Sequence, residues 1–409
     1  MLSSSHFQKR FALLKRSAFL NYALGSFFAA LGNGLGYIAM SWIVVSHYNN
    51  VESMAILMAS FWGPNVILGP FMGVLADKLR RKTIITLATV IRGIIFIIFS
   101  IYIIYHFNIV LIYFMMICIG IAFSAFYSTA SAFIRELVSP DDLMYANTMM
   151  DIAYEVGNVI GMSSAGLIIA WLSAENAILI NGFTFLIAAL FIFIIPKKAL
   201  SHGKQYVKRK INIRQDFIDG LVYLRKQKQL MSIYMLQLLI LMIFLTAPLL
   251  LVPFAKTVLH ANVAQFGMIE ALMSVGIVTG GILMPWFGEK YGFFRTVLFF
   301  SIVLFLVFLF FGYNTKIYLA GLFYCFIGFA GATWPLVISR AQNLTNIDFQ
   351  GRVQSTFNSL SGVLMLIFYF SIGLIGKYFG VQHLYLIEVF IALIAILFLI
   401  KIKHVRSDF

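Results

Sequence analysis

The residues of this chain that could do chemistry are mostly acidic side chains inside long apolar stretches. Asp151 and Glu155 are four residues apart and therefore share one face of a helix. Two carboxylates that are close together in a medium of low dielectric cannot both ionise cheaply, so one of them is expected to exchange protons. Glu270 is a third carboxylate in such a stretch. The pattern predicts proton coupling through Asp151, Glu155 and Glu270.

Arg92 is a cation well inside another apolar stretch. At 1.5 Å of helical rise per residue, Asp151 and Arg92 lie roughly 12 and 14 Å from the starts of their stretches. This similar depth predicts a structural ion pair, Arg92–Asp151, and leaves proton exchange at Asp151 or Glu155 as the alternative. Either role would offset the cost of an ionisable group at mid-bilayer, about 2.5–3.5 kcal/mol. Glu388 is expected near the bundle surface as an interfacial residue.

The elements that must position these residues are transmembrane helices. Apolar residues make up 61% of the 409 residues and charged residues only 11%, a composition that a soluble domain of this length could not bury. About 20 apolar residues cross a bilayer. The predicted fold is therefore an all-α membrane protein of twelve spans at residues 18–41, 54–75, 83–104, 109–133, 143–172, 178–195, 230–255, 264–286, 295–313, 317–338, 353–378 and 384–402.

The positive charges predict the orientation. If both termini are cytoplasmic, 26 of the 30 Lys and Arg residues fall on the cytoplasmic side, as the positive-inside rule requires. Lipid with anionic headgroups accounts for the net charge of +15, so no nucleic-acid partner is expected. Cys118 and Cys325 lie inside spans and suggest neither a disulfide nor a metal site.

The spans divide into two similar halves. Ile119-Gly120-Ile121-Ala122 in the fourth span recurs as Ile327-Gly328-Phe329-Ala330 in the tenth, and two further short matches have nearly the same offset. Parallel repeats of six helices are an architecture of rocking transporters. The expected domains are an N-terminal bundle at 1–195, a basic cytoplasmic linker at 196–229 with an amphipathic helix at 213–224, and a C-terminal bundle at 230–409.

One loop makes the prediction more specific. Residues 73–82, Gly-Val-Leu-Ala-Asp-Lys-Leu-Arg-Arg-Lys, resemble the major facilitator superfamily signature G-x-L-x-D-R-x-G-R-R/K, with Lys78 for Arg and Arg80 for the second Gly. Glycine permits close helix approach, and an Asp at a helix end can bind a neighbouring helix or an Arg. The resemblance implies two pseudo-symmetric six-helix halves and a cytoplasmic latch formed by Gly73, Asp77, Arg81 and Arg135.

The run from Ala132 to Leu143, followed by Ala146-Asn147, is similar to the branch of macrolide-efflux and enterobactin exporters. This resemblance implies efflux by a drug:proton antiporter. The fifth span keeps the glycine spacing of the exporters' Gly-Pro-x-x-Gly-Gly element at residues 157–166, but Met162 replaces its proline. The second-half loop has Phe293 and Phe294 where cations are expected.

In this superfamily the first, fourth, seventh and tenth spans mainly line a central cavity. The polar and aromatic candidates there are Asn21, Asn33, Tyr127, Gln237 and Trp334. Few polar groups among aromatic walls suit an amphiphilic organic solute. Pro248, Pro253 and Pro335 predict helix bends in the seventh and tenth spans.

The resulting hypothesis is an exporter of an amphiphilic small molecule, such as a macrolide-like drug or a siderophore, in the cell membrane. Its partners are the solute, protons and lipid, and it is expected to act as a monomer. No catalytic cluster and no nucleotide-binding loop are evident, so neither an enzyme nor a cofactor is expected. An importer of a small nutrient and a non-transporting sensor or assembly protein remain alternatives.

Overall fold

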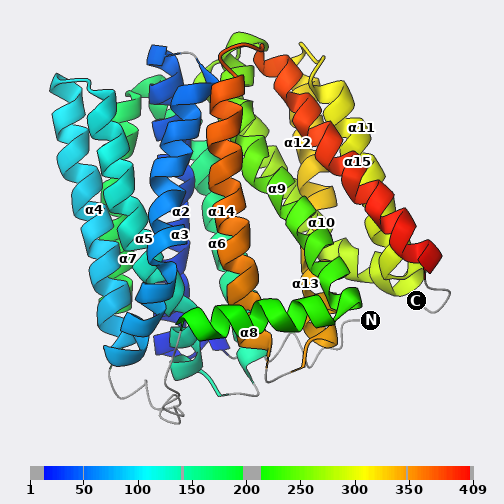
Figure 1. Ribbon diagram of the computed structural model, residues 1–409. Coiled ribbons are helices and arrows are strands. Elements are labelled where there is room, and N and C mark those ends of the chain that lie inside the picture. The colour runs from blue at the N-terminus through cyan, green and yellow to red at the C-terminus, as the bar shows by residue number, and fades with distance from the viewer. Residues whose placement is uncertain (1–12, 49, 140–141, 197–212, 347–348, 406–409) are drawn as a thin grey trace. The chain divides into compact units, whose positions relative to one another are not determined.

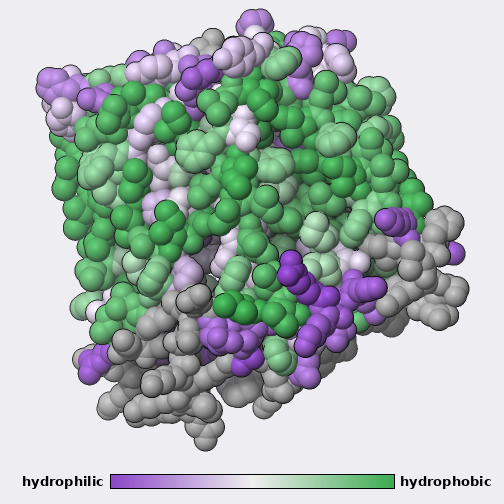
Figure 2. Space-filling view, in the orientation of Figure 1, coloured by the Kyte–Doolittle hydropathy of each residue, from purple (hydrophilic) through white to green (hydrophobic). Residues whose placement is uncertain are grey.

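The computed structural model describes residues 13–48, 50–139, 142–196, 213–346 and 349–405, and every regular element among them is a helix (Figure 1). Twelve spans, one of them formed by two consecutive helices, are long and apolar enough to cross a membrane. The predicted all-α fold of twelve spans is therefore confirmed. Figure 2 shows apolar side chains over the middle of these helices and hydrophilic side chains near their ends, as a multi-pass membrane protein requires.

The chain forms two compact units. Unit 1 comprises Met1–Ile43 and Ser60–Lys210. It holds most of the first six spans, which are α2 (Ser17–Tyr48), α3 (Val51–Lys78), α4 (Arg81–Tyr105), α5 (Ile109–Leu137), α6 (Leu143–Trp171) and α7 (Ala174–Ile194). Helix α4 packs against both α5 and α7. Because α4 lies between them, its side chains face several helices at once, and this position determines the surroundings of Arg92.

Helix α6 approaches α2 closely through glycine. A Cβ atom on Gly157 would lie 2.5 Å from the Phe27 carbonyl oxygen, and a Cβ on Gly161 would collide with the Leu31 carbonyl oxygen. Small residues at such contacts let helix backbones pack closely in a membrane. The glycine spacing kept in the fifth span thus serves a close contact with α2, even though Met162 replaces the proline of the exporter element.

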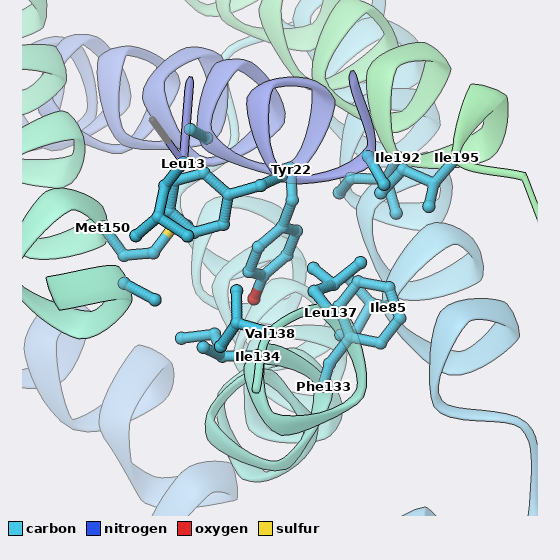
Figure 3. Close-up of a cluster of buried hydrophobic side chains, with 14 of the residues drawn as sticks. Leu13, Tyr22, Ile85, Phe133, Ile134, Leu137, Val138, Met150, Ile192 and Ile195 are labelled. Carbon is cyan, nitrogen blue, oxygen red and sulfur yellow. The ribbon is translucent and has the colours of Figure 1, made fainter. Parts of the chain in front are cut away.

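A buried apolar cluster lies where α2, α4, α5, α6 and α7 converge in unit 1 (Figure 3). The Tyr22 side chain points into this cluster among Ile134, Leu137 and Val138, and its hydroxyl donates to the Ala130 carbonyl oxygen over 3.4 Å. The rings of Tyr22 and Phe133 pack edge to face, with their centroids 5.0 Å apart. The cluster holds the helix ends that carry the predicted latch residues Arg81 and Arg135.

Unit 2 comprises Val44–Ala59 and Ile211–Phe409. Its helices are α8 (Ile213–Lys226), α9 (Lys228–Thr257), α10 (Val263–Tyr291), α11 (Phe293–Phe311), α12 (Ile317–Gly331), α13 (Trp334–Leu344), α14 (Gln350–Ile375) and α15 (Val381–Val405). Helix α15 packs on α9 and α11, and α10 packs along α12.

The end of α2 and the start of α3 belong to unit 2, whereas the sequence analysis placed residues 1–195 in one bundle. Two contacts join these helix ends to the rest of unit 2. Lys377 forms a 2.8 Å ion pair with Glu52, and Lys256 Nζ donates to the Val45 carbonyl oxygen over 3.2 Å. These residues lie at helix ends that are distant in the sequence, so sequence similarity between the halves cannot reveal the contacts.

The tenth span is interrupted. Helix α12 ends at Gly331 and α13 begins at Trp334, with Pro335 in its first turn, where a missing N–H costs nothing. The bend predicted at Pro335 is confirmed as a break between two helices. Pro248 and Pro253 lie inside α9, which stays helical from Lys228 to Thr257.

The amphipathic helix predicted at residues 213–224 is α8, which extends two residues further, to Lys226. It lies against α14, where Asp219 pairs with Arg352 at 3.3 Å and the Tyr223 ring stacks on Phe349 with centroids 4.4 Å apart. Residues 197–212 of the predicted linker lie outside the described residues.

Candidate functional site: buried polar groups in each unit

Arg92 lies at the centre of a polar cluster inside unit 1. Its side chain is only 2% exposed, and its Nη2 donates a hydrogen bond to the Asn33 side-chain oxygen. The guanidinium lies 4.0 Å from the centroid of the Phe185 ring and 5.5 Å from that of Phe123. The negative π-faces of these rings attract the cation, most strongly where water is excluded. The helices α2, α5 and α7 together hold this guanidinium in place.

The predicted ion pair between Arg92 and Asp151 is wrong. No ion pair joins these two described residues, because Asp151 lies on an exposed part of α6 and the Asn33 amide accepts the guanidinium hydrogen bond. The α6 side chain near Arg92 is instead Tyr154, three residues further along. Equal depth in the bilayer was therefore insufficient evidence for a pair, since the rotation of α6 decides which side chain faces α4.

Tyr154 links α6 to this cluster. Its side chain is 36% exposed, and its hydroxyl lies near the side chains of Asn33 and Asn158. Glu155, which is half-buried, interacts electrostatically with both Tyr154 and Asp151. The structure thus brings the predicted residues Asn33, Arg92 and Glu155 into one neighbourhood. We name the group formed by Asn33, Arg92, Tyr154, Glu155 and Asn158 the unit 1 polar cluster.

The sequence analysis missed Tyr154, Asn158 and Phe185. The spacing of the first two contained a signal, because Tyr154, Asn158 and the acidic residues recur at helical intervals of three and four. Phe185 gave no such signal, since aromatic residues occur throughout the spans.

The other two cavity candidates of unit 1 differ from each other. Tyr127 is 63% exposed and stacks on Phe123, with centroids 5.6 Å apart, and Phe123 in turn faces Arg92. Tyr127 therefore extends the aromatic surface of the cluster. Asn21 is half-buried, and no contact places it with the cluster in the part of the chain that the structure describes.

Gln237 and Trp334, the cavity candidates of unit 2, lie near the same apolar core. Gln237 is fully buried, and neither its amide nitrogen nor its oxygen has a hydrogen-bond partner among the described residues. Buried polar atoms are usually paired, so an unpaired amide in a helix core needs an explanation such as water or a ligand. Trp334 is half-buried and packs on the cluster that includes Leu236, the neighbour of Gln237.

Two carboxyl groups are buried in unit 2. Glu270 on α10 is 3% exposed. Glu388 on α15 is 0% exposed and hydrogen-bonded to Thr246 of α9, so the expectation of an interfacial residue at the bundle surface is wrong. An almost uniformly apolar helix offers no polar face, which is why its buried side could not be predicted.

Two of the four predicted latch residues, Gly73 and Asp77, cannot be compared with the prediction, because their surroundings lie outside what the structure describes. Arg81 is 4% exposed, and its Nη1 donates to Glu136 Oε1 over 2.9 Å. Arg135 is exposed. Arg81 and Glu136 both belong to unit 1, so this pair fastens the start of α4 to the end of α5. The sequence analysis did not assign a role to Glu136.

These arrangements suit binding and proton exchange. Among the described residues, no group of three or more His, Cys, Asp and Glu side chains could hold a metal ion. What the structure offers is a cation on aromatic faces, amides with hydrogen-bonding capacity, and carboxyls shielded from water. Such groups recognise a polar part of a solute or bind protons.

Several known proteins are similar to this chain. The chain is 25% identical to the uncharacterized MFS-type transporter YfmI of Bacillus subtilis over 285 residues, 68% of this chain and 69% of the relative. It is 28% identical over 156 residues to a protein of the same organism named as a bacilysin exporter, BacE, which covers 38% of each chain.

Solved structures share the fold. The nucleoside transporter NupG aligns with a TM-score of 0.75 at 16% identity, over 94% of this chain and 98% of its own. A bacterial homolog of the lysosomal transporter Spinster aligns with a TM-score of 0.65 at 13% identity, over 96% of each chain. Residues 22–260 and 238–408 each match the profile of the Major Facilitator Superfamily, and the chain therefore belongs to this family of membrane transporters.

Proposed function

We propose that this protein is a secondary active transporter that exports an amphiphilic small molecule, such as a macrolide-like drug or a siderophore, in exchange for protons. Membership of the superfamily supports transport rather than catalysis. The observation that supports the solute class is the unit 1 polar cluster, in which a buried Arg92 contacts two aromatic rings and the neutral Asn33 amide. Among the described residues, it pairs with no carboxylate.

The surroundings of Arg92 favour a solute with a hydrogen-bond acceptor or an anionic group. A charge buried without an opposite charge costs several kcal/mol, so its retention inside a membrane marks a functional site. A carboxylate or a carbonyl-rich group on the solute would supply the missing partner. The rings of Phe123 and Tyr127 would then contact its apolar part.

Proton coupling is proposed at Asp151, Glu155 and Glu270. Asp151 and Glu155 are close enough on α6 to repel each other electrostatically when both are ionised. A solute bound at Arg92 would change the field at Glu155, since Tyr154 interacts with both residues. This arrangement links solute binding to proton release within one unit, with the proton gradient as the energy source and no cofactor.

Export is the proposed direction because relatives include a protein named as an exporter, although it matches less than half of the chain. We propose that the halves at 1–195 and 230–409 alternate access to the solute about the linker at 196–229. Gly73, Asp77, Arg81 and Arg135 would latch the cytoplasmic side, with both termini in the cytoplasm of a cell-membrane protein that acts as a monomer.

Import of a small nutrient is the second candidate, supported by the likeness of the fold to the nucleoside transporter NupG. A non-transporting sensor would keep the fold without moving solute.

Accumulation of a compound panel in cells tests these functions. A macrolide, a fluorescent cation, a nucleoside and a catecholate siderophore are compared in cells with and without the protein, before and after collapse of the proton gradient. Export predicts lower accumulation of one compound, lost with the gradient. Higher accumulation would instead establish import, and no change with any compound would contradict export of this solute class.

The variant Arg92→Lys tests, in the same experiment, whether the solute binds at the unit 1 polar cluster. It keeps the positive charge but loses the planar group that stacks on Phe185 and donates to Asn33. Reduced transport by this variant at normal expression would link the solute to the unit 1 polar cluster.

A further inference from the structure

The carboxyl group of Glu388 is enclosed in the interior of unit 2. The side chain is 0% exposed, and Glu388 lies seven residues after the start of α15, about 10 Å along the helix axis. Its Oε1 contacts the Thr246 hydroxyl, and its Oε2 has no hydrogen-bond partner among the described residues. An ionised carboxylate in such a place would lack both water and a sufficient set of donors.

Among the described residues, no Lys or Arg forms an ion pair with this carboxyl. The charged or titratable residues of α9 and α11, the helices packed on α15, are Lys228, Tyr234 and Lys256 on α9 and Arg295 on α11. Lys256 is ten residues from Thr246, about 15 Å along α9. The titratable groups near Glu388 are instead Tyr385 on its own helix, Tyr324 on α12, which contacts Tyr385, and Glu270 on α10, whose charge acts on Tyr385.

Counting hydrogens indicates which group donates. The Thr246 hydroxyl has one hydrogen and contacts two oxygens, the Met242 carbonyl oxygen at 2.7 Å and Glu388 Oε1. A carbonyl oxygen has no hydrogen to give, so the one Thr246 hydrogen serves either the Met242 contact or the Glu388 contact. Both contacts are hydrogen bonds at the same time only if the Glu388 carboxyl supplies its own hydrogen.

The neighbouring tyrosines do not change this count. Tyr324 donates to the Ala247 carbonyl oxygen over 3.2 Å. The 3.4 Å contact between the Tyr324 and Tyr385 hydroxyls therefore uses the hydrogen of Tyr385. Both phenolic hydrogens are engaged elsewhere, which leaves none for a Glu388 carboxylate.

We propose that Glu388 is a proton-binding residue of unit 2, which holds a proton in this conformation, donates it to Thr246 and exchanges it with water during the transport cycle. The exchange is a simple acid–base step in which a proton from water on one side binds the carboxylate and later returns to water on the other side. When Glu388 releases its proton, its carboxylate becomes negative near Glu270. Water must therefore enter the site to solvate this charge. Thr246 is a positioning residue.

This inference extends the proposed proton coupling to a residue outside the three carboxyls assigned above. Its first test needs no solute. The infrared carbonyl stretch of a protonated carboxyl is measured on purified protein in lipid at neutral pH, as the difference between wild type and Glu388→Gln. Glu289→Gln removes an exposed carboxyl of the same unit and is the matched control. A protonated-carboxyl band lost only in Glu388→Gln supports the proposal, and its absence from wild type overturns it.

Two further measurements separate an exchanging proton from a trapped one. Transfer to D2O should shift the band in the folded protein, whereas a band that never shifts would overturn the exchange step. Thr246→Val should move the band to higher frequency, because the carboxyl loses its acceptor; an unchanged frequency would contradict the assigned hydrogen bond.

A transport assay of the Glu388→Gln variant is the last test, once a solute is known. Glu388→Gln should bind and exchange solute downhill but lose accumulation against a gradient, and uphill transport by this variant would overturn the coupling role. If the proposed export fails for every compound, the infrared band and its exchange in D2O still decide whether Glu388 binds a proton.

Discussion

At the scale of single residues, this protein keeps charged groups where the membrane makes them costly. Arg92 contacts Asn33 and two rings in unit 1, and Glu388 contacts Thr246 in unit 2. Neither has an opposite charge in contact among the described residues. A purely structural role would favour an apolar side chain at either position, so both residues are best explained by what they bind.

Replacement of Arg92 by methionine should separate function from stability. An apolar side chain of similar length removes an unmatched buried charge, which is often neutral or stabilising. We expect a detergent melting temperature equal to or above that of wild type. Transport should fall about tenfold or more, in line with loss of a charged hydrogen bond of about 1.5–3 kcal/mol. A clear drop in melting temperature with normal transport of the remaining folded protein would assign Arg92 to structure instead.

Replacement of Glu155 by glutamine should uncouple transport. The amide keeps the shape of the protonated side chain but cannot release a proton. Uphill efflux should be abolished while downhill exchange of solute persists. Asp151→Asn serves as the comparison on the same face of α6. Retained uphill efflux in Glu155→Gln would move the coupling role to Asp151, Glu270 or Glu388.

At the scale of helices, contacts at particular positions hold neighbours together. The sequence was sufficient to predict the number of spans and a bend near Pro335, because each depends on local composition. It was insufficient to predict that Asn33 rather than Asp151 bonds Arg92, or that Glu388 is buried. Those features depend on how apolar helices rotate against each other, which their uniform composition leaves open.

The contact between α2 and α6 can be tested with one methyl group. Gly161→Ala would place a Cβ against the Leu31 carbonyl oxygen and should destabilise the protein by about 1–3 kcal/mol. Gly281→Ala is the matched control, since no atom lies within 4 Å of its added Cβ. Thermal unfolding in detergent is the measurement. Equal melting temperatures for the two variants would show that the α2–α6 contact is not close.

The Arg81–Glu136 pair should couple the start of α4 to the end of α5. A double-mutant cycle with Arg81→Gln and Glu136→Gln should give a coupling free energy of about 1–2 kcal/mol, because Arg81 is buried and the bond is charge-assisted. The exposed Arg135→Gln with Glu136→Gln is the control cycle and should give none. Additive effects in the first cycle would remove this pair from any account of the latch.

At the scale of the whole molecule, two units of a major facilitator each hold a buried ionisable group that faces neutral or polar partners. Unit 1 offers a cation and hydrogen-bonding amides for a solute, with Glu155 beside them. Unit 2 offers Glu270 and Glu388 around the Tyr324–Tyr385 pair. Membership of the superfamily makes the chain a transporter, and the proposal assigns this division of polar groups to the exchange of solute for protons.

The most direct test is proton movement in proteoliposomes that contain the purified protein and a pH-sensitive dye. Addition of the solute found in the accumulation panel should drive a proton flux opposite to the solute, and an imposed pH gradient should concentrate the solute against its own gradient. Glu155→Gln should show neither effect. Solute movement that is indifferent to the pH gradient, with no proton flux, would contradict proton-coupled export.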